Sequence, residues 1–324
     1  NDDRKEKVAQ IVKVFKYNAI VQNLAPIAAD DYKQLRVADS VALQHMNRIL
    51  ELALSKEKTT EALTELFDEL GSEVRDADII RWYGMDANYY YLSEALCVPI
   101  IKTLLEEKIE TEPAEVINRI EDLMLNHSAN SMMTAVMDYA VIVARLYEKA
   151  LTLGSLTLNT ADEYVMRYES DYCFIDQYYR LANETYFGID PTSELFDTVQ
   201  KVKRGLDQNY SKLCNRINLE WTRCLKETGG MDEVHLLRQY NFYDEKIKSI
   251  HKKVVVIVSD ALRYEVAQEL IGELAKTRHI ASLKPAIAML PSETKYSKPS
   301  LLPHRELKLY GKGEEQGMAV DDHI

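Results

Sequence analysis

Glycine is scarce in this chain. It accounts for 11 of the 324 residues, under half of its usual share of roughly 7%. Because glycine supplies many of the tight turns between strands, its scarcity argues against a sheet-rich protein and favours long helices. The apolar fraction of 46% and the charged fraction of 28% are ordinary for a globular protein. Composition therefore predicts a mainly helical fold.

Cysteine is also sparse, and long apolar runs are missing. The four cysteines, at positions 97, 173, 214 and 224, have no CxxC or CxxxC spacing, which excludes a zinc finger. We expect all four to be reduced thiols, as in a cytoplasmic protein. Apolar runs such as 140–144 are far shorter than the roughly 18 residues of a membrane span. We therefore expect a cytoplasmic chain with no membrane partner.

Positive charge is lacking over most of the chain. The net charge is −12, and residues 1–250 carry 42 acidic against 29 basic side chains. Such a surface is a poor non-specific partner for nucleic acid, since phosphate binding needs clustered Lys and Arg. Residues 251–324 carry 11 basic and 10 acidic side chains, so any phosphate chemistry is expected there.

Helical periodicity dominates residues 1–250, which we expect to form a helical domain. A Gly-Gly pair in "TGGMDE" (228–233) predicts a break, followed by a short helix over about 232–250. The segment 161–187 places Tyr164, Tyr168, Tyr172 and Tyr179 on one helix face. A seam between helices is the favoured interpretation of these tyrosines, and a base-stacking platform is the alternative.

The pattern changes at "KVVVIVSDALRYEVAQEL" (253–270). Five branched apolar residues at 254–258 predict a buried strand that ends at Ser259-Asp260, and a helix is expected directly after it. A second short strand is expected over 280–290, followed by "LPSETKYS". Residues 251–324 therefore predict the opening of a parallel α/β sheet, as far as strand, helix, strand and loop.

Ligands of open α/β sheets bind outside the carboxyl ends of the strands. Asp260 follows the first predicted strand, and Ser292 and Thr294 follow the second, near a helix start that would suit a phosphate. A carboxylate that holds a metal beside a hydroxyl would activate that hydroxyl. The alternative is that Asp260 only caps the following helix. HExxH and GxSxG motifs and a Walker Lys-Ser/Thr are absent from the sequence.

The stretches "VVVIVSDALRYEVAQEL" and "AMLPSETKYSKPSLLPH" resemble the SDALRYE and LPSxT…LLPH patterns of the PglZ family. This family belongs to the alkaline phosphatase superfamily and is found in BREX-type phage-defence systems. "RYESDYCFIDQYYRL" is similar to the helical segment that precedes the family's catalytic domain. The resemblance covers about residues 160–322. It implies a mainly α chain with a helical domain (1–250), followed by the beginning of an α/β alkaline-phosphatase-like domain (251–324).

The resemblance implies a zinc-dependent phosphodiesterase or phosphatase. Asp260 would match a metal-ligand aspartate, and Thr294 the nucleophile, which also contacts the metal; Ser292 is the nearest rival hydroxyl. A zinc pair would be the cofactor. A phosphoester, possibly nucleic acid, would be the substrate, and other phage-defence proteins would be partners.

Two departures from the family pattern stand out. Glu293 precedes the threonine where an aromatic residue is usual, and Lys298-Pro299 interrupts the following helix. The other Asp/His ligands of the family lie further downstream. We therefore expect the chain, which begins without methionine, to be part of a longer protein and to be inactive alone. A non-catalytic interaction scaffold of a defence complex is the rival function.

Overall fold

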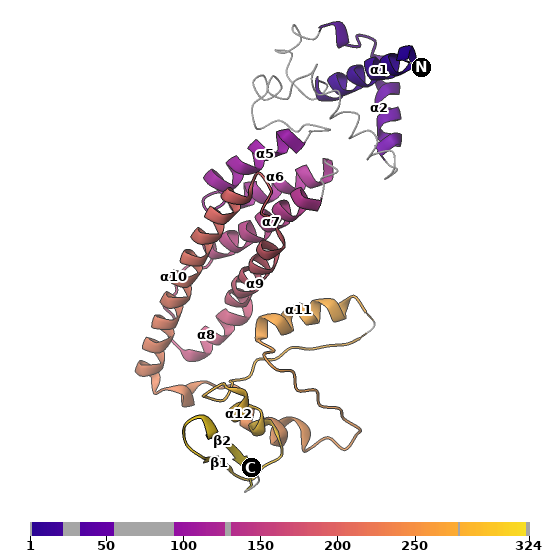
Figure 1. Ribbon diagram of the computed structural model, residues 1–324. Coiled ribbons are helices and arrows are strands. Elements are labelled where there is room, and N and C mark those ends of the chain that lie inside the picture. Colours follow the sequence, from indigo (N-terminus) through magenta and orange to yellow (C-terminus); the bar gives the residue numbers. More distant parts are fainter. Residues whose placement is uncertain (1, 22–32, 55–93, 127–130, 278, 322–324) are drawn as a thin grey trace. The chain divides into compact units, whose positions relative to one another are not determined.

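The computed structural model describes residues 2–21, 33–54, 94–126, 131–277 and 279–321 (Figure 1). Residues 22–32 and 55–93, inside the predicted helical domain, lie outside the described residues. The chain divides into two compact units. The first comprises residues 1–152 and 178–212, and the second comprises residues 153–177 and 213–324. The boundary expected at residue 250 stays a prediction.

The regular elements in the described part of the first unit are all helices. It contains α1 (Asp2–Val21), α2 (Ser40–Leu54), α5 (Glu94–Thr103), α6 (Pro113–Asn126) and α7 (Ser131–Leu151), with a π-helical turn at Leu104–Lys108 after α5. It also takes in the later part of α9 (Cys173–Gly188) and the first half of α10 (Phe196–Thr228). This confirms the mainly helical fold predicted from composition.

Helical spacing explains the core of the first unit, where α6 packs against α7 (Figure 1). In α6, Val116, Ile120 and Leu123 are buried at steps of four and three. In α7 the same spacing buries a longer row: Met133, Val136, Met137, Ala140, Val143, Ala144 and Tyr147. Each fully buried large aliphatic side chain contributes about 1.5–3 kcal/mol, so this seam is a main source of the unit's stability.

The second unit combines helix ends with a long irregular segment. It contains α8 (Ala161–Arg167), a π-helical segment (Tyr168–Tyr172), the start of α9 and the last half of α10. Later come α11 (Tyr264–Ala275), the one-turn α12 (Thr294–Ser297) and two strands, β1 (Leu307–Tyr310) and β2 (Gly317–Val320). The predicted helix over 161–187 is thus confirmed, with a π-helical turn inside it.

The predicted strand at 253–258 is wrong for this structure. The segment is extended but has no partner strand among the described residues, and its apolar side chains are exposed, Val255 by 78% and Ile257 by 86%. An apolar run specifies a strand only where neighbouring strands can pair with it. The Asp260 turn therefore follows an open extended segment, not a buried strand.

Two further local predictions are wrong. Residues 232–250 form short 3₁₀ turns and one π-helical turn in place of a regular helix. Residues 280–290 form no regular strand, and within the described part of the chain they make a single isolated parallel bridge, between Ile287 and Arg238. The helix expected after Asp260 is confirmed as α11.

The antiparallel hairpin β1–β2 was not predicted from the sequence; it pairs Leu307 with Val320 and Tyr310 with Gly317. Its loop contains Gly311 and Gly313 at φ +72° and +61°, a region open to glycine at little cost. A Cβ at Gly311 would lie 2.5 Å from the Glu315 carbonyl oxygen, so this position requires glycine.

Candidate functional site

Asp260 and Thr294, 34 residues apart in sequence, lie next to each other in the second unit. The Thr294 hydroxyl donates to Asp260 Oδ1 at 3.4 Å, the long end of hydrogen-bond distances. Both residues are exposed, so a ligand can reach the pair. No hydrogen bond joins Ser292 to Asp260 in the described structure. Of the two candidate hydroxyls, the structure brings Thr294 to the carboxylate.

The turn that carries Asp260 has an unusual backbone. Ala261, the next residue, has φ +54°, in the left-handed region that costs a non-glycine residue about 1–2 kcal/mol. Arg263 N–H donates to the Ala261 carbonyl at 2.9 Å, which closes the turn just before α11. Such backbone strain is found preferentially at functional sites.

Asp260 does not cap α11. The N-cap residue of α11 is Arg263, and it makes no side-chain capping bond. The alternative interpretation of the sequence, in which Asp260 is a helix cap, is therefore wrong for this structure. The carboxylate is left available for a ligand.

The first turn of α11 is anchored to the π-helical segment Tyr168–Tyr172. The Tyr264 hydroxyl donates to Glu169 Oε1 at 3.2 Å, and the Tyr264 and Tyr168 rings meet edge to face at 6.0 Å. Burial and the Glu169 carboxylate raise the pKa of Tyr264 to about 12, so the phenol stays protonated and can donate. Glu265 is 1% exposed and pairs with Arg263 at 2.8 Å. Tyr264, four positions after Asp260, thus fixes the turn to the helical segment, and the pair between Arg263 and Glu265 stabilises the start of α11.

The Thr294 loop is held by Gln239, which sequence analysis missed. The Gln239 side chain donates to the Ser297 carbonyl at 2.9 Å and accepts from Met289 N–H at 3.0 Å. Residue 239 also donates its backbone N–H to the Ile287 carbonyl at 3.0 Å. One amide side chain therefore ties both flanks of the loop. No local pattern marks a lone Gln in an irregular segment, so the sequence offers no signal for this role.

The helix at Thr294 is too short for the phosphate site that was expected at its start. The helix that begins at Thr294 is a single turn, α12, and ends before Pro299, as the sequence predicts. A helix this short has too small a dipole to serve as the expected phosphate site. Glu293 is exposed and pairs with Lys295 at 3.7 Å. This pairing offsets the repulsion that an unpaired carboxylate would exert on an anionic substrate.

The donors present do not complete a zinc site. Asp260 and Thr294 supply one carboxylate and one hydroxyl, whereas a catalytic zinc takes about three protein ligands. Across the described part of the chain, no group of three or more His, Cys, Asp or Glu side chains could hold a metal. No disulfide joins any of the four cysteines, all of which lie in the described residues. None of the described helices is long and apolar enough to cross a membrane.

The C-terminal region matches a known family. Residues 242–323 match the model of the BREX system PglZ alkaline phosphatase-like domain. Among curated proteins, the alkaline phosphatase-like protein BrxZ of Escherichia coli O9:H4 (strain HS) is 32% identical over 146 residues, 41% of this chain. The alkaline phosphatase-like protein PglZ of Bacillus cereus (strain H3081.97) is 28% identical over 173 residues, 50% of this chain.

The matched stretches span only 16% of the E. coli protein and 20% of the B. cereus protein. No solved structure matches the chain. The family match contains both Asp260 and Thr294, the two residues that the structure brings together. The resemblance predicted from the sequence is confirmed over residues 242–323, which match the PglZ domain model.

Proposed function

We propose that this chain contributes Asp260 and Thr294 to the active site of a metal-dependent phosphoric-ester hydrolase that acts in bacterial phage defence. The observation that carries the proposal is the contact between the Thr294 hydroxyl and Asp260 Oδ1, inside the family match. The strained Ala261 backbone and the absence of a capping role for Asp260 support it. Four cysteines without a disulfide fit a cytoplasmic site of action.

In this proposal Thr294 Oγ1 is the nucleophile. It forms a bond to phosphorus while the bond from phosphorus to the leaving alcohol oxygen breaks, and water then hydrolyses the phosphothreonine. Asp260 orients the hydroxyl and would be one metal ligand. A zinc pair would need further ligands from a longer protein, because the described residues supply too few. The substrate class is a phosphoester, with nucleic acid as one candidate.

The experiment measures hydrolysis of bis(p-nitrophenyl) phosphate with added zinc. We expect no turnover by these 324 residues alone, and zinc-dependent turnover by a longer protein that also supplies the missing ligands. Turnover by the chain alone that survives repurification and disappears in Thr294→Ala would show that its own residues complete the site. A longer protein that binds zinc but hydrolyses no phosphoester would contradict the proposal.

The rival function is an interaction scaffold without catalysis. It is favoured by the lack of a three-ligand metal group among the described residues and by the exposed apolar segment 254–258. The two functions differ in a measurable way. A scaffold would assemble with other defence proteins equally well after Thr294→Ala and would give no protection that depends on this hydroxyl.

A further inference from the structure

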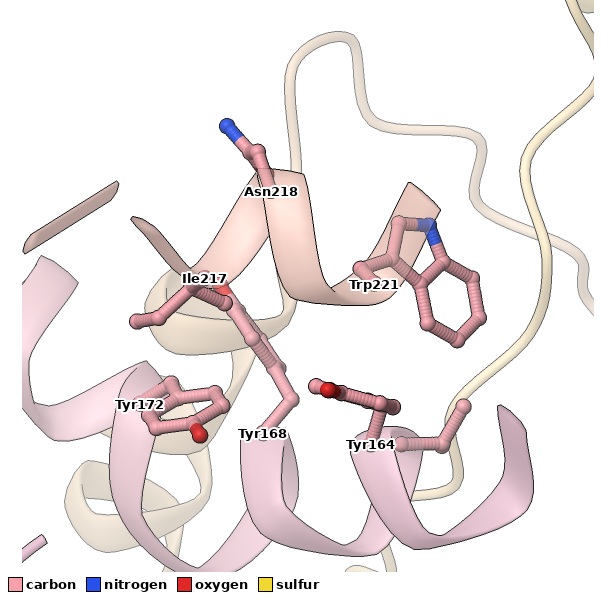
Figure 2. Close-up of a pocket in the computed structure, with 7 residues that line it drawn as sticks. Tyr164, Tyr168, Tyr172, Ile217, Asn218 and Trp221 are labelled. Carbon is pink, nitrogen blue, oxygen red and sulfur yellow. The ribbon is translucent and has the colours of Figure 1, made fainter. Parts of the chain in front are cut away.

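Asp260 and Thr294 are supported in two different ways. The Asp260 turn lies against packed helices, because Tyr264 contacts the Tyr168 ring edge to face at 6.0 Å. Tyr168 is one of the side chains that line a pocket between the helical segment 164–172 and α10 (Figure 2). The carboxylate of the candidate site is therefore placed by helix packing.

The loop that carries Thr294 has little packing of its own. Residues 290–294 are all exposed. Tyr296 is buried, and its hydroxyl donates to Gln316 Oε1 at 3.3 Å, which holds the loop on the C-terminal side of Thr294. The stretch on the N-terminal side of Thr294 therefore needs support of another kind.

Gln239 joins the two ends of this loop through one side-chain amide. Its oxygen accepts from Met289 N–H at 3.0 Å, and its nitrogen donates to the Ser297 carbonyl at 2.9 Å. An amide carries an acceptor and a donor in one planar group, so the two bonds fix both the separation and the orientation of the loop ends. The backbone of Gln239 is itself held, since its N–H donates to the Ile287 carbonyl at 3.0 Å.

Gln239 lies outside the family match, which begins at residue 242. The segment that contains it is tied to α8, because the backbone N–H of His235 donates to Asp162 Oδ1 at 2.9 Å. The amide that holds the Thr294 loop is thus supplied by the segment that precedes the matched domain, and not by the domain itself.

We propose that Gln239 is a positioning residue, which keeps the Thr294 hydroxyl beside Asp260 by holding both ends of the loop. This inference rests on the proposed function, in which Thr294 is the nucleophile. The Thr294–Asp260 contact, at 3.4 Å, is already at the long end of hydrogen-bond distances. A further displacement of about 1 Å can cost about a hundredfold in rate. Gln239 contacts the loop backbone, so it acts on the reaction through Thr294.

The first measurement is amide hydrogen exchange on the 324-residue chain. Gln239→Met removes both side-chain bonds and keeps a side chain of similar length, whereas Gln239→Glu keeps the acceptor for Met289 and loses the donor to Ser297. We expect the Met289 N–H to exchange about fivefold faster in Gln239→Met and at the parental rate in Gln239→Glu. Gln268→Met, at a half-buried glutamine of α11, is the matched control. Circular dichroism and melting temperature check that all three variants fold.

The second measurement is turnover of bis(p-nitrophenyl) phosphate by the longer protein, expressed per bound zinc so that unfolded enzyme does not count. Because Gln239 places the nucleophile and not the substrate, its loss should lower kcat and leave KM unchanged. We expect kcat to fall about a hundredfold in Gln239→Met, and less in Gln239→Glu, which retains one of the two bonds. Gln268→Met should keep the parental kcat and KM.

A parental kcat in Gln239→Met, in a longer protein that Thr294→Ala inactivates, would overturn the positioning role and leave the proposed hydrolase intact. A raised KM at parental kcat would assign Gln239 to substrate binding and would overturn it too. Parental exchange of the Met289 N–H in Gln239→Met would show that the amide does not hold the loop in solution. A parent protein that hydrolyses no phosphoester would overturn the hydrolase, and this inference with it. If Gln239→Met does not fold, the kcat of Gln239→Glu decides.

Discussion

The carboxylate of Asp260 is exposed and makes no capping bond to α11, so it is not needed for that helix. We therefore expect Asp260→Asn to change the free energy of unfolding by less than about 0.5 kcal/mol. In an active longer protein the same substitution should lower phosphoester turnover about a hundredfold or more. Melting temperature, bound zinc and turnover measure these effects. Turnover equal to that of the parent would show that the Asp260 carboxylate is not part of the active site.

Thr294 is expected to matter through its hydroxyl alone. In the longer protein Thr294→Ser should retain part of the activity, since a hydroxyl remains, whereas Thr294→Ala should lose it. Ser292→Ala is the matched control, because Ser292 is an exposed neighbour with no hydrogen bond to Asp260 in the described structure. Loss of activity in Ser292→Ala together with full activity in Thr294→Ala would show that Ser292, and not Thr294, is the nucleophile.

His235 and Asp162 form a contact that depends on pH. His235 Nδ1 of the imidazole ring lies 2.8 Å from Asp162 Oδ2. The backbone N–H of His235 donates to Asp162 Oδ1 at 2.9 Å. The hydrogen bond and the charge of Asp162 raise the pKa of His235, while the bonds from His235 lower the pKa of Asp162. The histidine contribution to stability is therefore complete below pH about 6.5 and is lost as the pH rises through the raised pKa.

The aspartate contribution follows the opposite rule. It is complete above pH about 3.9 and is lost as the pH falls through the lowered pKa. We expect NMR titration to show the pKa of His235 above its ordinary value, and to show it return to that value in Asp162→Asn. An unchanged His235 pKa in Asp162→Asn would mean that the contact does not persist in solution.

At the scale of elements, α8 begins with a side-chain N-cap at Thr160, and Glu163 supports the residue before it. The Thr160 hydroxyl accepts from Glu163 N–H at 3.2 Å, and Glu163 Oε2 accepts from Asn159 N–H at 2.9 Å. We expect Thr160→Ala to lower the free energy of unfolding by about 1 kcal/mol, and Thr160→Ser to be nearly neutral. Urea unfolding measures both. Equal losses in the two variants would point to packing of the threonine methyl group and not to the cap.

Helices were predictable here because their signal is local. The buried rows of α6 and α7 repeat every three or four residues, and this spacing alone identifies an amphipathic helix. The segment 254–258 has an equally clear pattern, but a strand also needs a neighbour that sequence periodicity does not supply. The hairpin β1–β2 is short, and its alternation covers only four residues per strand. These facts explain why the long amphipathic helices were predicted, why the strand expected at 254–258 was wrong, and why the hairpin β1–β2 was not predicted.

At the scale of the whole molecule, the candidate site was predicted from its residue types and the family resemblance. Asp260 and Thr294 belong to continuous motifs, and the structure places them together. The groups that hold them could not be predicted, because each acts across a long stretch of chain. Tyr264 contacts Glu169 across 95 positions, and Gln239 contacts Ser297 across 58. The composition of a motif identifies reactive groups, but only the fold shows what supports them.

The open segment 254–258 has a consequence for the behaviour of the chain in solution. Five exposed β-branched residues without proline or charge have the composition of an amyloid-forming stretch. Charged neighbours act as gatekeepers against such stacking, and here they are Lys252 and Lys253 before the stretch and Asp260 after it. The aspartate of the candidate site is thus also one of the charges that oppose fibril growth.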